Sequence, residues 1–353
     1  MYRYEDIQEV HIEPTQNCNA ACLQCDRNKN GGEDNPYLTG AELTDKDYKD
    51  IFSPSFIRQL KSMFMCGNLG DPCVSKYSLD GYRHFRQNNN TVWLGMNTNG
   101  GARDTSYWQE LADIIGRKGI VTFSVDGLED TNHLYRQKVK WERVVENAQA
   151  FIDAGGRARW DYLVFKHNEH QVDEANRLAD KMGFEEFRAK KTGRFFSTIK
   201  HKGKQEHQGT NRKGENTQKL EKPKQEKFIN KELKKETEIV NKHGSMEEYY
   251  KTCEISCKVQ TQKSIFINAE GLFLPCCWVG GQMYKWYWKP RHSDVWKFID
   301  LQDLNVKKNS LKEVMEGPFL KSIEESWQHP YRPKVCANKC GKEFDAFAAQ
   351  FQS

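Results

Sequence analysis

Residues 10–25 read VHIEPTQNCNAACLQC, an apolar run of strand length that is followed directly by three cysteines. Cys18, Cys22 and Cys25 have the spacing C-x3-C-x2-C, which chance places in a chain of this cysteine content only about 0.01 times. Three thiolates on one tight loop can hold three irons of a cubane [4Fe–4S] cluster and leave the fourth iron open, whereas most electron-transfer clusters have four cysteine ligands. A structural zinc site with a fourth ligand from His11 or from elsewhere in the chain is the alternative, although no second C-x2-C motif pairs with this loop.

Apolar runs of strand length continue beyond this loop and alternate with helical patterns. The chain from residue 9 to residue 190 divides into six units of about 30 residues, which is the size of one strand–helix–strand step. This alternation predicts an α/β fold with a parallel sheet, either an open or partial barrel or a doubly wound sheet. In both arrangements the functional site lies at the carboxyl ends of the strands. The predicted strands are 10–12, 62–66, 92–96, 120–125, 162–165 and 184–187.

Charge and cysteine content divide the 353 residues into three parts. The net charge of the whole chain is +5, and the segment 199–244 alone carries 13 Lys or Arg against 7 Asp or Glu. Its few apolar residues predict a solvated, mobile linker, with a basic arm for an acidic partner as the alternative. We therefore predict an N-terminal barrel over 1–192, a basic linker or insertion over 193–250 and a cysteine-rich domain over 251–353.

The chain has no run of about 18 apolar residues and no apolar signal-peptide core. We therefore expect a cytoplasmic protein with no membrane contact. The presence of 11 cysteines in such a compartment favours metal or redox chemistry over disulfides. Because the basic excess is confined to one segment, we consider nucleic acid an unlikely partner.

The C-terminal part holds a second set of cysteines around a predicted β-hairpin. The alternating stretches 264–268 and 272–276 flank a turn that ends in Gly271. Cys276 and Cys277 are adjacent at the end of this hairpin, and on a strand their side chains would point to opposite faces. Four cysteines in paired loops suit either an iron–sulfur cluster or zinc. The complete set is Cys253, Cys257, Cys276, Cys277, Cys336 and Cys340.

Several motifs, in this order along the chain, resemble those of the radical S-adenosylmethionine (SAM) enzymes. The cysteine triplet follows the first strand, a Gly70–Asp71 pair follows the second, and a Thr-Asn-Gly turn that contains Asn99 follows the third. The fourth strand carries a Ser/Asp-Gly…Arg pattern. The resemblance covers residues 8–190 and implies a partial (β/α)6 barrel of the TIM type. The residues of this last pattern are Ser124, Asp126 and Arg136.

The resemblance also assigns roles to these residues. It implies that the cluster on the triplet binds SAM at its open iron, that Gly70 and Asp71 receive the amino group of SAM, and that Ser124 and Arg136 meet its carboxylate. In this chain Asp71 stands where those enzymes have Glu. The assignment therefore rests on the backbone contact of the Gly70–Asp71 pair more than on the contact of the Asp71 side chain. The other residues predicted to contact SAM are Asn99, Asp126 and Asn168.

The C-terminal cysteines resemble the SPASM/Twitch extensions of radical SAM enzymes, which hold auxiliary clusters. The spacing Gly-x4-Cys in those extensions selects Cys276. The spacing between the first cysteine of the motif and this glycine favours Cys257 over Cys253. The C-x2-C-x5-C-x3-C run of a two-cluster module is absent, so the resemblance implies one auxiliary [4Fe–4S] cluster. Its implied ligands are Cys257, Cys276, Cys336 and Cys340, and zinc remains the alternative.

The resemblance implies reductive cleavage of SAM to a 5′-deoxyadenosyl radical, which abstracts hydrogen from a substrate. We predict a peptide substrate, with small-molecule dehydrogenation or rearrangement as the alternative, and a flavodoxin- or ferredoxin-type electron donor. Cys66 is a candidate hydrogen donor to a substrate radical, although a buried inert thiol is the more common role for such a cysteine. Non-enzymatic alternatives are an iron–sulfur electron carrier and a zinc-stabilised nucleic-acid-binding protein.

Overall fold

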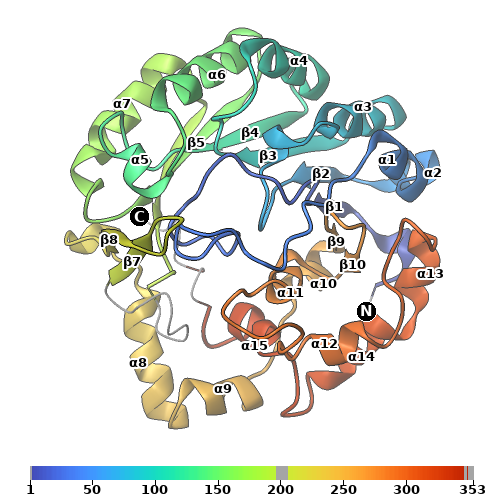
Figure 1. Ribbon diagram of the computed structural model, residues 1–353. Coiled ribbons are helices and arrows are strands. Elements are labelled where there is room, and N and C mark those ends of the chain that lie inside the picture. Colours follow the sequence, from blue (N-terminus) through green and yellow to red (C-terminus); the bar gives the residue numbers. More distant parts are fainter. Residues whose placement is uncertain (1, 196–205, 346–347, 349–353) are drawn as a thin grey trace.

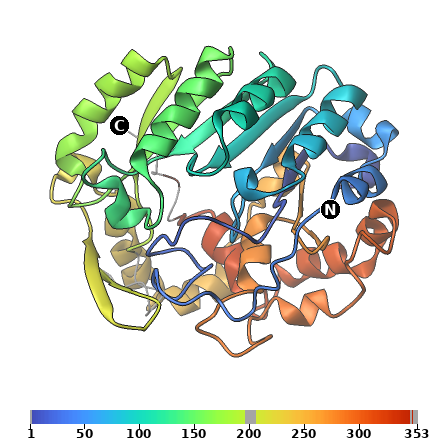
Figure 2. The ribbon, with the colours of Figure 1, turned by 45° about the horizontal axis from the view of Figure 1, so that its top comes forward.

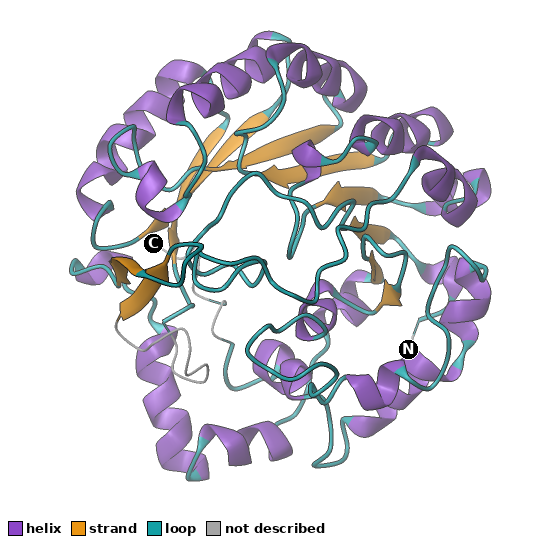
Figure 3. Cartoon of the chain, viewed as in Figure 1, coloured by secondary structure: helices purple, strands orange, loops and turns teal. Residues whose placement is uncertain are grey.

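A single curved sheet of eight strands forms the centre of the computed structural model, which describes residues 2–195, 206–345 and 348. The strands have the order β10-β9-β1-β2-β3-β4-β5-β6 and curve around the middle of the molecule (Figures 1 and 3). Neighbouring strands are parallel except for the pair β9–β10. This confirms the predicted α/β class. The strands are β1 (Glu9–Ile12), β2 (Ser62–Met65), β3 (Trp93–Thr98), β4 (Gly119–Ser124), β5 (Ala158–Val164), β6 (Glu186–Lys191), β9 (Ser264–Ile267) and β10 (Phe273–Leu274).

Helices cover the outer face of this sheet (Figure 1). Their ends follow local capping chemistry: the Asp104 carboxylate accepts the backbone N–H of Tyr107 at the start of α4, and Gly183 ends α7 with a φ of +87°. The ring of Phe123 on β4 contacts Trp108 of α4 and lies near α6, so every second strand residue faces the helices. The barrel helices are α1 (Asp45–Ile51), α2 (Pro54–Gln59), α3 (Ser78–Asn88), α4 (Thr105–Ile115), α5 (Asn132–Tyr135), α6 (Trp141–Asp153) and α7 (Val172–Met182).

The predicted C-terminal hairpin is present as β9 and β10, but it belongs to the barrel sheet. Strand β9 pairs in parallel with β1, with Val10 opposite Ile265, so the cysteine-rich part continues the sheet on the side of β1 that β2 leaves open. None of the helices in the described ranges is long and apolar enough to cross a membrane. The C-terminal helices are α9 (Met246–Thr252), α10 (Lys258–Gln262), α11 (Cys277–Gln282), α12 (Trp296–Ile299), α13 (Leu311–Glu316), α14 (Pro318–Ser326) and α15 (Lys334–Cys340).

The described part of the basic segment is ordered, which differs from the predicted linker. It forms the antiparallel hairpin β7 (Glu206–Thr210) and β8 (Asn216–Glu221), followed by α8 (Glu232–His243). This hairpin lies beside the N-terminal loop that carries the cysteine triplet (Figures 1 and 2). The order of this segment has a physical reason. The segment has few apolar residues, but His207 and Leu220 are both buried against the rest of the chain. Short 3-10 turns in the described ranges are Tyr4–Asp6, Pro72–Val74, Glu169–Gln171 and Glu226–Phe228.

Candidate functional site

The cysteine triplet lies on the loop that leaves the carboxyl end of β1. A turn brings two of its members together, because the backbone N–H of Cys25 donates to the carbonyl of Cys22 over 3.1 Å. The Cys22 side chain is buried, while Cys18 and Cys25 are partly exposed. The structure therefore places the predicted cluster loop at the strand ends, where barrel enzymes carry their active sites.

Each thiol of the triplet has a polar neighbour from a different loop of the barrel. The sulfur of Cys18 lies 3.7 Å from Asn99 Nδ2, the sulfur of Cys22 lies 3.8 Å from Arg136 Nη1, and the sulfur of Cys25 lies 4.0 Å from the Asn68 carbonyl. Burial raises the pKa of Cys22 to about 11, and Arg136 opposes this shift. Three sulfur donors on one loop are the ligand set that an iron–sulfur cluster with one open iron needs.

The described side chains form no ready-made site for a single metal ion, and this holds for the cysteines as well. Within residues 2–195, 206–345 and 348, no group of three His, Cys, Asp or Glu side chains is arranged to hold one ion. His11, one candidate for the fourth ligand of a zinc site, instead has its Nε2 at 2.9 Å from the Cys66 carbonyl. Its ring stacks on Phe64.

The Gly70–Asp71 loop follows β2 and packs against the cluster loop. A Cβ atom on Gly70 would lie 1.8 Å from the Thr15 carbonyl oxygen, so only glycine fits this close approach. The Asp71 carboxylate accepts hydrogen bonds from Thr98 Oγ1, from the Asn99 backbone and from Asn99 Nδ2, each over 2.7 Å. The Asp71 side chain therefore joins the loops after β2 and β3, and the SAM contact of the Gly70–Asp71 pair stays a prediction.

Glu13 is a site residue that the sequence analysis missed. It follows β1 directly, and its carboxylate accepts the backbone N–H of Leu69 over 2.7 Å and that of Gly70 over 3.3 Å. Only 2% of Glu13 is exposed, and burial raises its pKa to about 7. The period of two along β1, which puts Glu13 on the same face as His11, is the sequence signal that could have identified it.

We expect Glu13→Gln to stabilise the protein increasingly as the pH rises from 5 to 8. The pKa of about 7 exceeds the ordinary value of 4.5, so between these values the native state keeps a proton that the unfolded state has released. Stability is therefore lost as the pH rises through this window, whereas glutamine keeps an acceptor oxygen without the charge. The expected gain is roughly 1–3 kcal/mol at pH 8 and nearly zero at pH 4.

Thermal melts of both proteins across this pH range measure the difference. The half-buried Glu9 on the same strand provides the control, and Glu9→Gln should not show the trend. A gain from Glu13→Gln that is equal at pH 4 and pH 8 would disprove the role given to the Glu13 charge.

The residues after β4 and β5 form a second polar network. Arg136 Nε pairs with Asp126 Oδ2 at 2.7 Å, and Asp126 Oδ1 accepts the backbone N–H of Leu163 over 2.6 Å. This holds the Arg136 guanidinium beside Cys22, while Ser124 ends β4 with a partly exposed side chain. Arg136 therefore lies beside the cysteine triplet and Ser124 lies at the end of β4, and their contacts with SAM stay predictions.

Asn168 has a different role from the predicted SAM contact. Its amide nitrogen donates to the carbonyls of Asp126 and Leu163, and its amide oxygen accepts the backbone N–H of Phe165. The residue is fully buried. Because these bonds use its side chain to fix the end of β5, the amide supports the loop and does not face a ligand.

Two further cysteines lie near this site. Cys66 follows β2, is partly exposed, and burial raises the pKa of its thiol to about 11. Cys73 is completely buried. The candidate hydrogen donor therefore has solvent access, whereas Cys73 is a packing residue.

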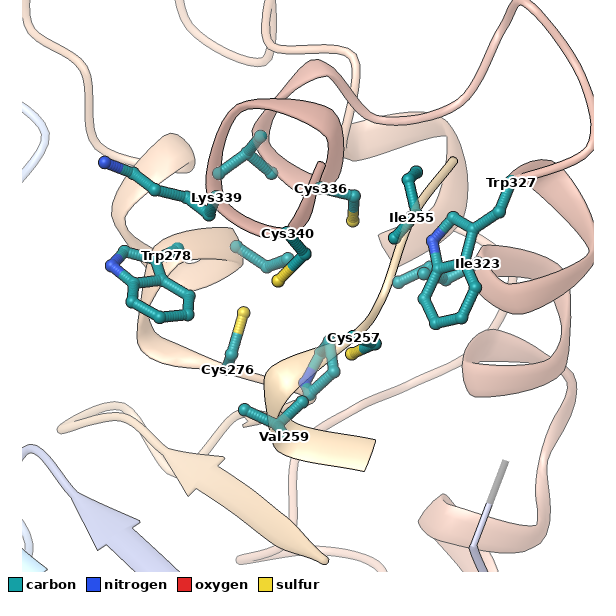
Figure 4. A pocket seen from close by; sticks show the side chains of 13 residues that line it. Ile255, Cys257, Val259, Cys276, Trp278, Ile323, Trp327, Cys336, Lys339 and Cys340 are labelled. Carbon is teal, nitrogen blue, oxygen red and sulfur yellow. The ribbon is translucent and has the colours of Figure 1, made fainter. Parts of the chain in front are cut away.

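The four predicted auxiliary ligands line one pocket (Figure 4). Cys257 precedes α10, Cys276 caps the start of α11, and Cys336 and Cys340 lie on α15. A hydrogen bond between thiols lowers the pKa of Cys340 to about 7 and raises that of its partner Cys257. The structure thus gathers sulfur donors from three segments, the donor set that a four-cysteine cluster needs. The apolar lining residues are Ile255, Val259, Pro275, Trp278, Val279, Ile323, Trp327 and Val335.

The two remaining C-terminal cysteines lie outside this pocket. Cys253 packs in a separate small core with Tyr249. Cys276 and Cys277 begin a helix and are not strand residues as predicted, because the chain turns into α11 directly after β10. The Cys277 carbonyl accepts Asn68 Nδ2 over 2.7 Å, which connects α11 to the loop after β2.

We expect His207→Leu on β7 to destabilise the protein by about 1–3 kcal/mol, because it leaves a buried carbonyl without a partner. His207 Nε2 lies 2.8 Å from the Leu23 carbonyl, between Cys22 and Cys25, and Thr210 Oγ1 donates to the Lys29 carbonyl over 2.7 Å. The urea midpoint and the iron content of purified protein are the measurements, and both should fall. Lys213→Ala, at the exposed end of the same hairpin, is the control and should change neither.

An unchanged midpoint and iron content in His207→Leu would show that the hairpin does not support the cluster loop. Such a result would restore the linker prediction for this segment.

Comparisons with known proteins show which solved structures have a fold similar to that of this chain. No protein-family model and no curated protein sequence matches the chain. Solved structures do match, including Streptococcus suis SuiB bound to the precursor peptide SuiA, with a TM-score of 0.57, 15% identity and coverage of 98% of this chain and 76% of SuiB. Histidine-tagged anSMEcpe with bound AdoMet matches with a TM-score of 0.55, 14% identity and coverage of 90% of this chain and 79% of that one.

A further match is anSMEcpe with bound AdoMet and the Cp18Cys peptide, with a TM-score of 0.52, 14% identity and coverage of 90% of this chain and 82% of that one. At such low identity the likeness shows a common fold, here with proteins that have been solved with AdoMet or a peptide bound. The chain therefore has the partial TIM-type fold of radical SAM enzymes, as its motifs predict.

Proposed function

We propose that this protein is a radical SAM enzyme that cleaves SAM reductively and abstracts hydrogen from a substrate. The observation that carries the proposal is the juxtaposition of the cysteine triplet with the Gly70 loop and Arg136 at the strand ends. An iron–sulfur electron carrier has no need of an open cluster beside a second, glycine-containing loop. The fold shared with SAM-bound anSMEcpe supports the same conclusion.

The residues of this chain would divide the work as follows. Cys18, Cys22 and Cys25 would hold the [4Fe–4S] cluster, which when bound supplies the electron that cleaves the C5′–S bond of SAM and yields a 5′-deoxyadenosyl radical. The Gly70 backbone would receive the SAM amino group, and Arg136, oriented by Asp126, its carboxylate. Glu13 holds the Gly70 loop in place.

The four-cysteine pocket would hold the auxiliary cluster. With all four irons ligated by protein, that cluster would have no open position for SAM. The pocket walls are mainly apolar. The bond between Asn68 and the Cys277 carbonyl fixes α11, which carries the Cys276 ligand at its start, against the loop that would hold SAM.

We propose a peptide as the substrate, since SuiB and anSMEcpe have been solved with peptides bound. A small molecule is the second candidate. The proposal also includes a flavodoxin- or ferredoxin-type protein as the electron donor and the cytoplasm as the compartment, where a reducing milieu protects the clusters.

Metal analysis and product analysis on anaerobically purified protein test this function together. We expect about eight irons and eight sulfides per chain, and 5′-deoxyadenosine after addition of dithionite and SAM. Stoichiometric zinc without sulfide would identify a zinc-stabilised binding protein. Two clusters without 5′-deoxyadenosine would identify an electron carrier.

A further inference from the structure

A buried hydrogen-bond donor lies in the wall of the four-cysteine pocket. Trp327 follows α14 directly and lines this pocket together with Cys336 (Figure 4). Its indole nitrogen Nε1 is buried, and within the part of the chain that the structure describes it makes no hydrogen bond. A buried N–H group without an acceptor is rare in folded proteins, because it has lost its hydrogen bonds to water. The group that the four cysteines bind is therefore the expected source of the acceptor.

The indole nitrogen lies on the side of the pocket where Cys336 is. Figure 4 shows it at the edge of the Trp327 ring that is turned toward the cysteines. Burial raises the pKa of the Cys336 thiol well above its usual range, and the approach of the Trp327 N–H opposes this rise. A donor has this effect only at short range, so the N–H faces the Cys336 sulfur even though the contact is not a full hydrogen bond.

The other three sulfurs of the pocket have donors from the backbone. Burial raises the pKa of Cys276 to about 12, and backbone N–H groups at the start of α11 oppose this shift. Cys257 and Cys340 each have a backbone N–H donor in addition to the bond between their thiols. A substitution does not remove these donors, whereas the donor at Cys336 belongs to a side chain. The backbone donors are Val279 for Cys276, Gln260 for Cys257 and Lys258 for Cys340.

Hydrogen bonds to the ligand sulfurs help to set the reduction potential of an iron–sulfur cluster. Reduction adds one electron to the cluster and no proton, so the negative charge on the sulfurs increases. An N–H donor therefore stabilises the reduced cluster more than the oxidised one. The mainly apolar walls of this pocket strengthen the effect, because a hydrogen bond is electrostatically stronger in surroundings of low dielectric constant.

We propose that the indole N–H of Trp327 donates a hydrogen bond to the auxiliary cluster at the Cys336 sulfur and raises the reduction potential of that cluster. This inference rests on the proposed function and deepens it, since it names a residue that sets how readily the auxiliary cluster accepts an electron. A zinc ion held by the same cysteines would undergo no reduction, so the inference also separates the two candidate occupants of the pocket.

Electron–nuclear double resonance on the reconstituted, dithionite-reduced protein tests the contact when tryptophan carries 15N at the indole nitrogen only. We expect 15N coupling to the auxiliary cluster in the wild type. All nine tryptophans carry the label, so loss of the coupling in Trp327→Phe assigns it to this residue. Trp278→Phe is the matched control and should keep the coupling, because Trp278 lines the same pocket with its nitrogen pointing away from the sulfurs (Figure 4).

A redox titration followed by electron paramagnetic resonance measures the consequence for the potential. Loss of the Trp327 donor should make reduction of the auxiliary cluster roughly two- to tenfold less favourable, which is a shift of its midpoint by about 20–60 mV to more negative values. The midpoint of the cluster on the cysteine triplet should not change in Trp327→Phe. Both midpoints should stay at the wild-type values in Trp278→Phe.

A reduced auxiliary cluster without 15N coupling in the wild type would overturn the inference. An unchanged auxiliary midpoint in folded Trp327→Phe, an equal shift in Trp278→Phe, or zinc in place of iron in the pocket would do the same. If Trp327→Phe does not fold, the wild-type 15N measurement decides alone. SAM cleavage is measured on the same samples: cleavage without 15N coupling overturns this inference alone, and 15N coupling without cleavage overturns the proposed function.

Discussion

Replacement of Cys18, Cys22 and Cys25 together by alanine is expected to remove about four irons per chain and to abolish 5′-deoxyadenosine release. The three thiols are the only cysteines on the loop after β1, and each has its own neighbour from the surrounding loops. Without them, this loop has no thiolate left to hold a cluster. Iron and sulfide analysis with chromatography of the reaction products measures the effect.

Cys73→Ala is the matched control for this variant. Cys73 is fully buried near the same loops, so its loss should cost roughly 1 kcal/mol of stability and leave iron content and cleavage unchanged. Undiminished 5′-deoxyadenosine release from the triple variant would refute the assignment of the triplet.

The second large effect is expected from Cys276→Ala combined with Cys340→Ala. These residues come from different helices that meet in one pocket, so their loss should remove a second set of about four irons. Formation of 5′-deoxyadenosine should continue, because the triplet lies on a separate loop, while conversion of the substrate should stop. The melting temperature should also fall, since a metal site contributes to folding free energy.

Cys253→Ala is the control for the auxiliary site. Cys253 precedes the pocket in sequence but packs in the separate core with Tyr249, so its replacement should keep all the iron. Two full clusters in the double variant would refute the ligand assignment. Complete loss of SAM cleavage in a folded double variant would refute the separation of roles between the two clusters.

The fold was predictable where one face of each strand is completely apolar. Met63 and Met65, or Val121 and Phe123, are fully buried against helices, so the apolar runs marked the strands. The hairpin at β9 was also visible locally, but its partner β1 was not, because no local pattern records a pairing between residues so far apart in sequence.

The basic segment was misread for a related reason. The hairpin of β7 and β8 has few apolar residues, and its order depends on bonds to distant backbone carbonyls such as those of Leu23 and Lys29. The amino-acid composition of a segment indicates only how much apolar surface the segment can bury. It gives no information about hydrogen bonds to distant backbone carbonyls.

The candidate site was predictable in its spaced motifs and not in its supporting bonds. The cysteine triplet was predicted from its spacing, and Arg136 from the resemblance of its motif. Glu13, by contrast, has no motif, and Asn168 was given a ligand role although its amide is used by neighbouring backbone groups. Whether a buried polar side chain faces a ligand or the backbone depends on the loop conformation, which spacing alone does not specify.

The most direct test of the central claim is an electron–nuclear double resonance measurement on the reduced protein with SAM labelled with 15N at its amino group. If the triplet holds a cluster with an open iron that binds SAM, the 15N nucleus must show hyperfine coupling to the cluster spin. We expect this coupling in the wild type and in Cys276→Ala/Cys340→Ala. A reduced cluster whose signal shows no 15N coupling in saturating SAM would contradict the account.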